Sequence, residues 1–175
     1  MLDATVRLLA TDGVARTSMD RVAAAAGVSK VTVYTRWATK NELIGAALAH
    51  LRLGRVPEPS GAVRDDLVAL LEAMREQYTE VGAMSILGTC LADEPGSGDL
   101  LGIVREATLL PRRALFAAVL RAGVERGELR AGLDVEAATS LVVGALYADH
   151  LAGRDTSAPG WPGAVVDLAL SGLRP

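Results

Sequence analysis

The sequence predicts an all-α protein in two parts, and three observations support this. Three helix-capping patterns and one turn glycine fall within about thirty residues, from Thr17 to Leu43. Apolar residues recur at helical spacing along most of the remaining chain. The stretch of residues 54–62 interrupts that periodicity with two prolines and two glycines. We therefore expect a helix-turn-helix domain over residues 1–53, made of three helices and a connecting fourth, and a larger helical domain over residues 54–175.

The composition is that of a globular protein whose charge is unevenly distributed. Half of the residues are apolar, 22% are charged, and the net charge is −3. Residues 1–55 nevertheless carry eight Lys and Arg against four Asp and Glu, whereas residues 56–175 carry ten against seventeen. A basic N-terminal part on an acidic body is the distribution expected of a protein that presents its N-terminal part to nucleic acid.

The first two predicted helices precede the turn of the motif. The first covers residues 1–13, ends at Gly13, and turns inward the side chains of Leu2, Val6 and Leu9. The second begins at Thr17, because Thr17 and Asp20 fit the Ser/Thr-x-x-Asp/Glu capping pattern. Its apolar stripe contains Met19, Val22, Ala23 and Ala26. Gly27 ends this helix, since glycine adopts a positive φ at no steric cost.

Two further caps begin the third and fourth predicted helices. Ser29 is the N-cap of the third, and Val28 with Val33 forms a hydrophobic staple that fixes how the chain enters this helix. Thr39 is the N-cap of the fourth, with Glu42 as its capping-box partner. We expect the fourth helix to end at Gly54, and its apolar stripe contains Leu43, Ala47, Leu48 and Leu51.

The third helix has a competing interpretation. Residues 31–35, Val-Thr-Val-Tyr-Thr, favour a strand on intrinsic propensity. We favour a helix, because caps flank the segment and the chain offers no convincing partner strand. Val33 and Trp37 would then face the core. The exposed side chains would be Lys30, Val31, Thr32, Tyr34, Thr35 and Arg36.

That exposed face suits the major groove of DNA. Lysine can reach guanine O6 and N7, valine and threonine methyls can contact the thymine methyl, and hydroxyl groups can bind phosphates or base edges. Lys40 stands in the first turn of a predicted helix, where the helix dipole disfavours a cation. A phosphate bound there would reverse this effect. The alternative is a lysine that contacts only solvent.

The motif places the following residues at fixed spacings: Thr17-Ser18, Val22-Ala23, Ala26-Gly27-Val28-Ser29, Thr32-Val33-Tyr34, Arg36-Trp37, Lys40 and Leu43. This pattern, over residues 2–48, resembles the N-terminal signature of the TetR family of bacterial transcriptional regulators. The resemblance implies a dimeric repressor that leaves its double-stranded operator DNA when a small ligand binds the C-terminal domain. Trp37 departs from the family pattern, in which Phe is commoner.

The resemblance also implies a role for individual residues of this chain. The implied phosphate contacts are Thr17 or Ser18, Tyr34, Arg36 and Lys40. The implied base contacts are Lys30, Val31, Thr32 and Thr35.

Beyond residue 62 the periodicity predicts helices over 63–81, 84–92, 100–109, 111–127 and 134–153, and a last one containing residues 165–173. The glycines near residues 94–102 lack the dinucleotide-binding spacing, and we expect a loop over 94–99. Large or soft side chains on inner helical faces are candidates for an effector pocket, although plain core is the favoured interpretation of each: Tyr78, Met84, Cys90, Phe116 and Tyr147. The mostly aliphatic interior favours an apolar or amphipathic effector.

The helix predicted over residues 134–153 is apolar around most of its circumference. Such a helix must be covered on all sides, and a second copy of the protein is the natural cover. With the last helix it would form a four-helix homodimer interface that includes Leu141, Val142, Ala145, Val165, Val166 and Leu170. A twofold dimer would place two recognition helices about one DNA turn, 34–36 Å, apart.

The sequence offers little for catalysis. His50 and His150 are far apart, Cys90 is the single cysteine, and the nucleophile, zinc and phosphate-loop motifs are absent. We therefore expect no enzyme activity, no metal and no cofactor. The lone cysteine fits a reducing cytoplasm, and no apolar run approaches the roughly 18 residues of a membrane helix. The alternative function is a helical module whose helix-turn-helix contacts protein rather than DNA.

Overall fold

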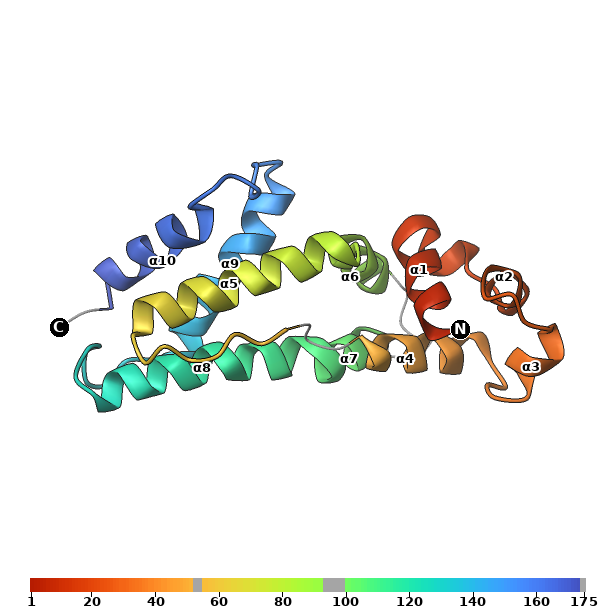
Figure 1. Cartoon of the computed structure of the whole chain (residues 1–175), viewed down its shortest axis with the longest axis horizontal. Helices are drawn as coiled ribbons and strands as arrows, with labels where there is room; N and C mark the ends of the chain where they lie inside the picture. Colours follow the sequence, from red (N-terminus) through yellow and green to blue (C-terminus); the bar gives the residue numbers. More distant parts are fainter. Residues whose placement is uncertain (52–54, 93–99, 174–175) are drawn as a thin grey trace. The chain divides into compact units, whose positions relative to one another are not determined.

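The computed structural model describes residues 1–51, 55–92 and 100–173, and every regular element in that part of the chain is a helix (Figure 1). Met1–Arg52 and Gln77–Leu110 form one compact unit, and Leu53–Glu76 and Pro111–Pro175 form a second. The predicted loop over 94–99 lies outside the described residues, as does Gly54 itself. None of the described helices is both long enough and apolar enough to cross a membrane.

The first unit contains the helix-turn-helix motif and further helices that pack on it. Its complete helices are α1 (Leu2–Arg16), α2 (Met19–Ala25), α3 (Lys30–Tyr34), α4 (Lys40–His50), α6 (Ala83–Ala92) and α7 (Leu100–Val104), followed by a π-helical turn η1 (Arg105–Leu109). Because α6 packs on α1, and α7 on α4, the compact unit is larger than the motif. The predicted functional division into residues 1–53 and 54–175 stays a prediction.

Two apolar clusters hold the first unit together. The buried members of one cluster all lie in the motif, and partly buried side chains of the motif and of the N-terminal segment pack against them: Met19, Val22, Ala23, Val33 and Leu43, with Met1, Leu2, Leu8, Val28 and Trp37. The other joins α1 and α4 to α6 and α7, and includes Leu9, Ile44, Leu48, Ile86, Cys90 and Leu100. Met19, Val22 and Ala23 of the predicted stripe are therefore confirmed as buried, whereas Ala26 is only half-buried. Burial of these side chains, at about 25 cal/mol per Å² of apolar surface, is the main term that holds short helices such as α3 in place.

Several predicted helix ends differ from the structure, among them three in and beside the motif. The first helix does not stop at Gly13: that residue adopts φ 74° and ψ 173°, and the chain resumes helical turns to Arg16. The N-cap of α2 is Ser18 rather than Thr17. Helix α4 ends at His50, with Leu51 in an extended conformation as its C-cap. At Thr17 and Ser18 two adjacent hydroxyls could cap α2, and the Thr17 hydroxyl is instead buried and bonded to Gly13.

The second unit is built from most of α5 (Val63–Glu80), α8 (Leu110–Glu125), α9 (Val135–Leu151) and α10 (Trp161–Ser171). Side chains buried in it include Leu67, Leu71, Phe116, Leu120, Val142, Val166 and Leu170. Gly123 allows the start of α5 to approach α8, since a Cβ at this position would lie 2.6 Å from a methyl carbon of Val63. Asp134 accepts a hydrogen bond from the Ala137 amide at 3.0 Å, so the predicted N-cap of α9 is confirmed.

The helices predicted over residues 100–109 and 111–127 are not separated by a loop. Helix α7, η1 and α8 follow one another without a break from Leu100 to Glu125. Pro111 lacks an N–H, and its ring prevents a regular bond to the carbonyl of Ala107. The π-helical turn lies directly before this proline and widens the helix there.

Candidate nucleic-acid interface

The turn between α2 and α3 is built from local signals in the sequence. Gly27 adopts φ 65°, and two residues later Ser29 caps α3 by accepting a hydrogen bond from the Thr32 amide at 3.1 Å. Val33 has no exposed surface and belongs to the apolar cluster of the motif. The prediction of a helix over the strand-favouring segment is thus confirmed, because the cap and the burial of Val33 outweigh intrinsic propensity.

The outer face of α3 and of the turn that follows is exposed. Val31 is 73% exposed and Tyr34 is 53% exposed, and the side chains of Lys30, Thr35 and Arg36 are also at the surface. Thr32 is half-buried. The outer face of this helix therefore combines an apolar, an aromatic and two cationic side chains, all of them exposed.

The hydroxyl groups on this face make bonds within the motif. The Thr35 Oγ1 donates to the carbonyl of Val31 at 2.7 Å, and the Thr32 Oγ1 lies 2.8 Å from the Ser29 Oγ. Their methyl groups are consequently fixed relative to the helix. Fixed methyl groups are suited to contacts with thymine methyls.

Lys30 is held by a carboxylate of the preceding helix. Its Nζ lies 2.5 Å from the Oδ2 of Asp20, ten residues earlier, and the side chains are 64% and 50% exposed respectively. The hydrogen bond and charge of Asp20 raise the pKa of Lys30 above its ordinary value. The sequence indicated Asp20 only as a capping residue, because nothing local links residues in two different helices.

Three of the predicted phosphate-binding residues also serve the fold. Thr17 is only 2% exposed, and its hydroxyl donates to the carbonyl of Gly13 at 2.8 Å. Neighbouring Ser18 is half-buried and its Oγ accepts the Arg21 amide at 3.3 Å. Lys40 is half-buried and donates to the carbonyl of Val14 at 2.9 Å, so it is not the purely solvated lysine considered as the alternative.

The start of α4 is fixed by a variant of the predicted capping box. Thr39 accepts a hydrogen bond from the Glu42 amide at 3.1 Å, as predicted. The Glu42 carboxylate accepts from the amide of Ala38 at 2.9 Å, one residue before the N-cap. Both bonds satisfy free N–H groups at the helix start and place Arg36, Trp37 and Lys40 at a defined turn.

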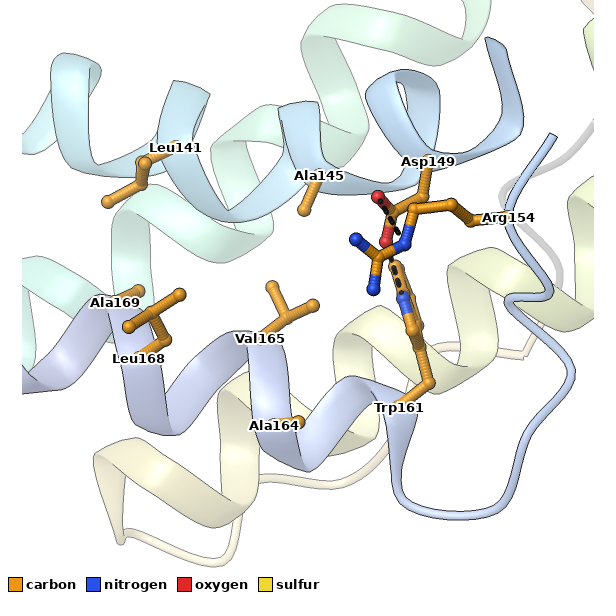
Figure 2. Close-up of a pocket in the computed structure, with 9 residues that line it drawn as sticks. All are labelled: Leu141, Ala145, Asp149, Arg154, Trp161, Ala164, Val165, Leu168 and Ala169. Atoms are coloured by element: carbon orange, nitrogen blue, oxygen red, sulfur yellow. Dashed lines mark hydrogen bonds and ion pairs between the residues drawn. The ribbon is translucent and has the colours of Figure 1, made fainter. Parts of the chain in front are cut away.

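A hollow of about 360 Å³ lies between α9 and α10 in the second unit (Figure 2). Its walls are mostly apolar and include Leu141 and Ala145 from α9 and Ala164, Val165 and Leu168 from α10. Leu168 is 78% exposed, and Leu141 is also at the surface. One end is polar, since the Trp161 indole N–H donates to the Asp149 carboxylate at 2.8 Å, with Arg154 beside it.

The residues predicted for a dimer interface divide into two groups. Val142, Val166 and Leu170 are buried in this chain's own core, which corrects the prediction that they face a second copy. Leu141, Ala145 and Val165 line the exposed hollow. A helix that is apolar on most sides has no polar face that would show which side turns inward. The sequence therefore predicted one interface for both groups.

The residues predicted for an effector pocket lie in both units. Tyr78, Met84 and Cys90 belong to the first unit, and Phe116 and Tyr147 to the second. None of them lines the hollow between α9 and α10, a second beside α1 and the end of α4, or a third beside residues 56–59. The pocket stays a prediction. Among the described residues, no three His, Cys, Asp or Glu side chains gather closely enough to hold a metal ion.

Both parts of the chain match known protein families. Residues 1–47 match the family described as bacterial regulatory proteins, tetR family, and residues 57–169 match the tetracyclin repressor-like C-terminal domain. The HTH-type transcriptional regulator Rv1556 of Mycobacterium tuberculosis is 37% identical over 131 residues, which are 74% of this chain and 63% of the relative. The chain thus spans less than two thirds of the length of this relative.

Further relatives cover more of their own length. The regulator AqdR of Rhodococcus erythropolis is 30% identical over 98% of this chain and 83% of the relative. The crystal structure of the TetR family transcription regulator SCO0332 superposes with a TM-score of 0.70 at 31% identity, covering 99% of this chain and 96% of the other. The chain belongs to the TetR family of bacterial transcriptional regulators.

Proposed function

We propose that this protein is a DNA-binding transcriptional regulator whose α3 enters the major groove. The observation that carries the proposal is the exposed face of Lys30, Val31, Tyr34 and Arg36 on a helix locked by the Ser29 cap and buried Val33. The first helix of such a motif crosses the DNA backbone while the second presents side chains to base edges. The base contacts we propose are Lys30, Val31, Thr32 and Thr35.

The phosphate contacts we propose are Ser18, Tyr34, Arg36 and Lys40. Ser18 is preferred over Thr17, because the Thr17 hydroxyl is buried and bonded to Gly13. An ammonium group has three donors, so Lys40 can bind a phosphate while it keeps its bond to Val14.

We further propose that the protein is a homodimeric repressor. The exposed apolar hollow formed by Leu141, Ala145, Val165 and Leu168 supports a twofold interface made of α9 and α10 from each copy. A relative named DNA-binding transcriptional repressor TetR, from Mycobacteroides abscessus, is 36% identical over 78% of this chain and 71% of the relative. That name favours repression over activation.

The effector we propose is apolar or amphipathic. The buried side chains of the second unit are mostly aliphatic, which favours an effector with a large apolar part. FadR of Bacillus subtilis, whose structure is a complex with stearoyl-CoA, superposes with a TM-score of 0.78 at 17% identity, which supports this class of effector.

Duplex binding at several salt concentrations tests the central proposal against the alternative of a protein-docking module. The probe is a pool of duplexes with a randomised centre, because selection from it also yields the preferred sequence. Binding through phosphates falls with a log–log slope of about −0.9 per phosphate neutralised. Arg36→Gln should weaken binding, whereas the control Arg130→Gln, an exposed residue of the second unit, should not. Absent or salt-insensitive binding would favour the docking module.

A further inference from the structure

We infer that Asp20 determines the sequence preference of the protein by positioning the ammonium of Lys30. Asp20 would not contact a base itself, and it is therefore a positioning residue. The inference rests on the proposed function, because it requires that α3 lies against base edges. It assigns a role to a carboxylate that neither the capping of α2 nor the phosphate contacts use.

The geometry brings the two groups together across the turn of the motif. Asp20 lies in the first turn of α2 and Lys30 is the first residue of α3. The Lys30 Nζ and the Asp20 Oδ2 are in direct contact, and the ammonium donates a charge-assisted hydrogen bond to the carboxylate. The N-terminal end of α3 disfavours a cation, and the carboxylate of Asp20 offsets this effect.

The pair contributes little to the stability of the fold. Both side chains are at least half exposed, and ion pairs in such positions are weakened by solvent and salt. A lysine that is not anchored has a long, flexible side chain and acts as a mobile point charge. Such a lysine would contact the nearest phosphate of any sequence as readily as a guanine acceptor.

Anchoring restricts where the ammonium can reach. With one of its three N–H groups bonded to Asp20, Lys30 keeps two donors for acceptors such as guanine O6 and N7. Less side-chain freedom remains to be lost on binding. The carboxylate also repels phosphates, which opposes binding in any register that brings the backbone close to the start of α3. Both effects favour one base pair at the position that Lys30 meets.

The test compares wild-type protein with Asp20→Asn, Lys30→Met and the double variant. Each is selected against the same pool of duplexes with a randomised centre, and affinity is measured by fluorescence anisotropy on the selected duplex and on an unrelated one. Asp20→Asn should bind the unrelated duplex more tightly and should lower the preference at one base-pair position by about threefold or more. A good side chain–base contact gives roughly fivefold discrimination or more, so this loss is measurable. In the Lys30→Met background, Asp20→Asn should leave the preference unchanged.

Other outcomes would overturn the inference. If Asp20→Asn tightens binding to all duplexes equally, the carboxylate acts only by repulsion. If it lowers the preference equally in the Lys30→Met background, Asp20 reads a base directly. Asp20→Glu, which keeps the carboxylate, should retain most of the preference, and circular dichroism of each variant checks the fold. If the wild-type protein shows no salt-dependent duplex binding, the proposed function itself is refuted. This result is distinguishable from the two outcomes for Asp20→Asn, both of which require that the wild-type protein binds DNA.

Discussion

The ammonium of Lys40, the first residue of α4, donates a hydrogen bond to the carbonyl oxygen of Val14 at 2.9 Å. The same carbonyl accepts the amide of Thr17 at 3.2 Å, where the chain leaves α1. A lysine near the last carbonyls of a helix interacts favourably with its dipole. Lys40 therefore compensates for its unfavourable place at the start of α4 by stabilising the end of α1, and it joins the two helices.

Replacing Lys40 should affect both stability and DNA binding. Lys40→Met should lower the free energy of unfolding by roughly 0.5–1.5 kcal/mol, because the half-buried carbonyl of Val14 loses a donor. It should also weaken duplex binding, since a proposed phosphate contact is removed. Urea denaturation followed by circular dichroism measures the first effect and anisotropy the second. Lys40→Arg should preserve most of both. Unchanged stability in Lys40→Met would mean that the hydrogen bond to Val14 does not contribute to the free energy of unfolding in solution.

Tyr34 and Arg36 should differ in how their loss depends on salt. Both side chains are exposed, so Tyr34→Phe and Arg36→Gln should leave the fold intact. Each should weaken binding to every duplex sequence by a similar factor, because phosphate contacts carry no sequence information. Arg36→Gln should also reduce the log–log salt slope by about 0.9, whereas Tyr34→Phe should not, since only the arginine releases a counterion. Equal slopes in all three proteins would contradict the assignment of Arg36.

The parts of the motif that depend on neighbouring residues could be predicted from the sequence. Ser29 and Thr39 each accept the amide three residues ahead, and Gly27 adopts the expected positive φ. Such bonds close within one turn of chain, and their residue types follow directly from the chemistry. At Thr17 and Ser18 two adjacent hydroxyls could both cap α2, and the burial of Thr17 against α1 decided for Ser18.

The parts that depend on contacts between helices could not be predicted. The partners of Lys30 and Lys40, Asp20 and Val14, lie in other helices, and no spacing rule connects them. The sequence also could not show which face of α9 is buried. Leu141 and Val142 are equally apolar, yet Leu141 is exposed and Val142 is fully buried. The packing of the other helices, and not the composition of the helix itself, decides which of its faces stays exposed and can contact a partner.

A charged substitution in the exposed wall of the α9–α10 hollow should produce a monomeric protein. Leu168→Glu places a charge on an apolar surface that a second copy would cover, and it should prevent dimerisation without unfolding the second unit. Analytical ultracentrifugation measures the mass. Leu151→Glu is the matched control, because Leu151 is at least as exposed and does not line the hollow. A dimeric Leu168→Glu protein, or a wild-type protein that is already monomeric, would contradict the proposed interface.

The hydrogen bonds of the Asp66 carboxyl predict how the stability of the second unit depends on pH. Burial acts to raise the pKa of this carboxyl, but hydrogen bonds from the Ser60 hydroxyl, the Ser60 amide and the Gly61 amide outweigh it and hold the pKa below its ordinary value. A group with a lowered folded-state pKa stabilises the fold above its unfolded pKa, about 3.9 for aspartate, and loses this contribution as the pH falls through the folded pKa. The free energy of unfolding should therefore decrease as the pH is lowered below about 4.

The variant Asp66→Asn tests this assignment to one carboxyl. An amide cannot accept three hydrogen bonds as a carboxylate does, so the variant should be less stable near neutral pH by roughly 1–3 kcal/mol. Its free energy of unfolding should depend less on pH below about pH 4, because the titrating group is gone. Asp65→Asn, at the neighbouring exposed position, is the matched control and should keep the wild-type acid profile. Urea midpoints measured across the acid range give both quantities, and identical profiles for wild type and Asp66→Asn would show that other carboxyls cause the acid sensitivity.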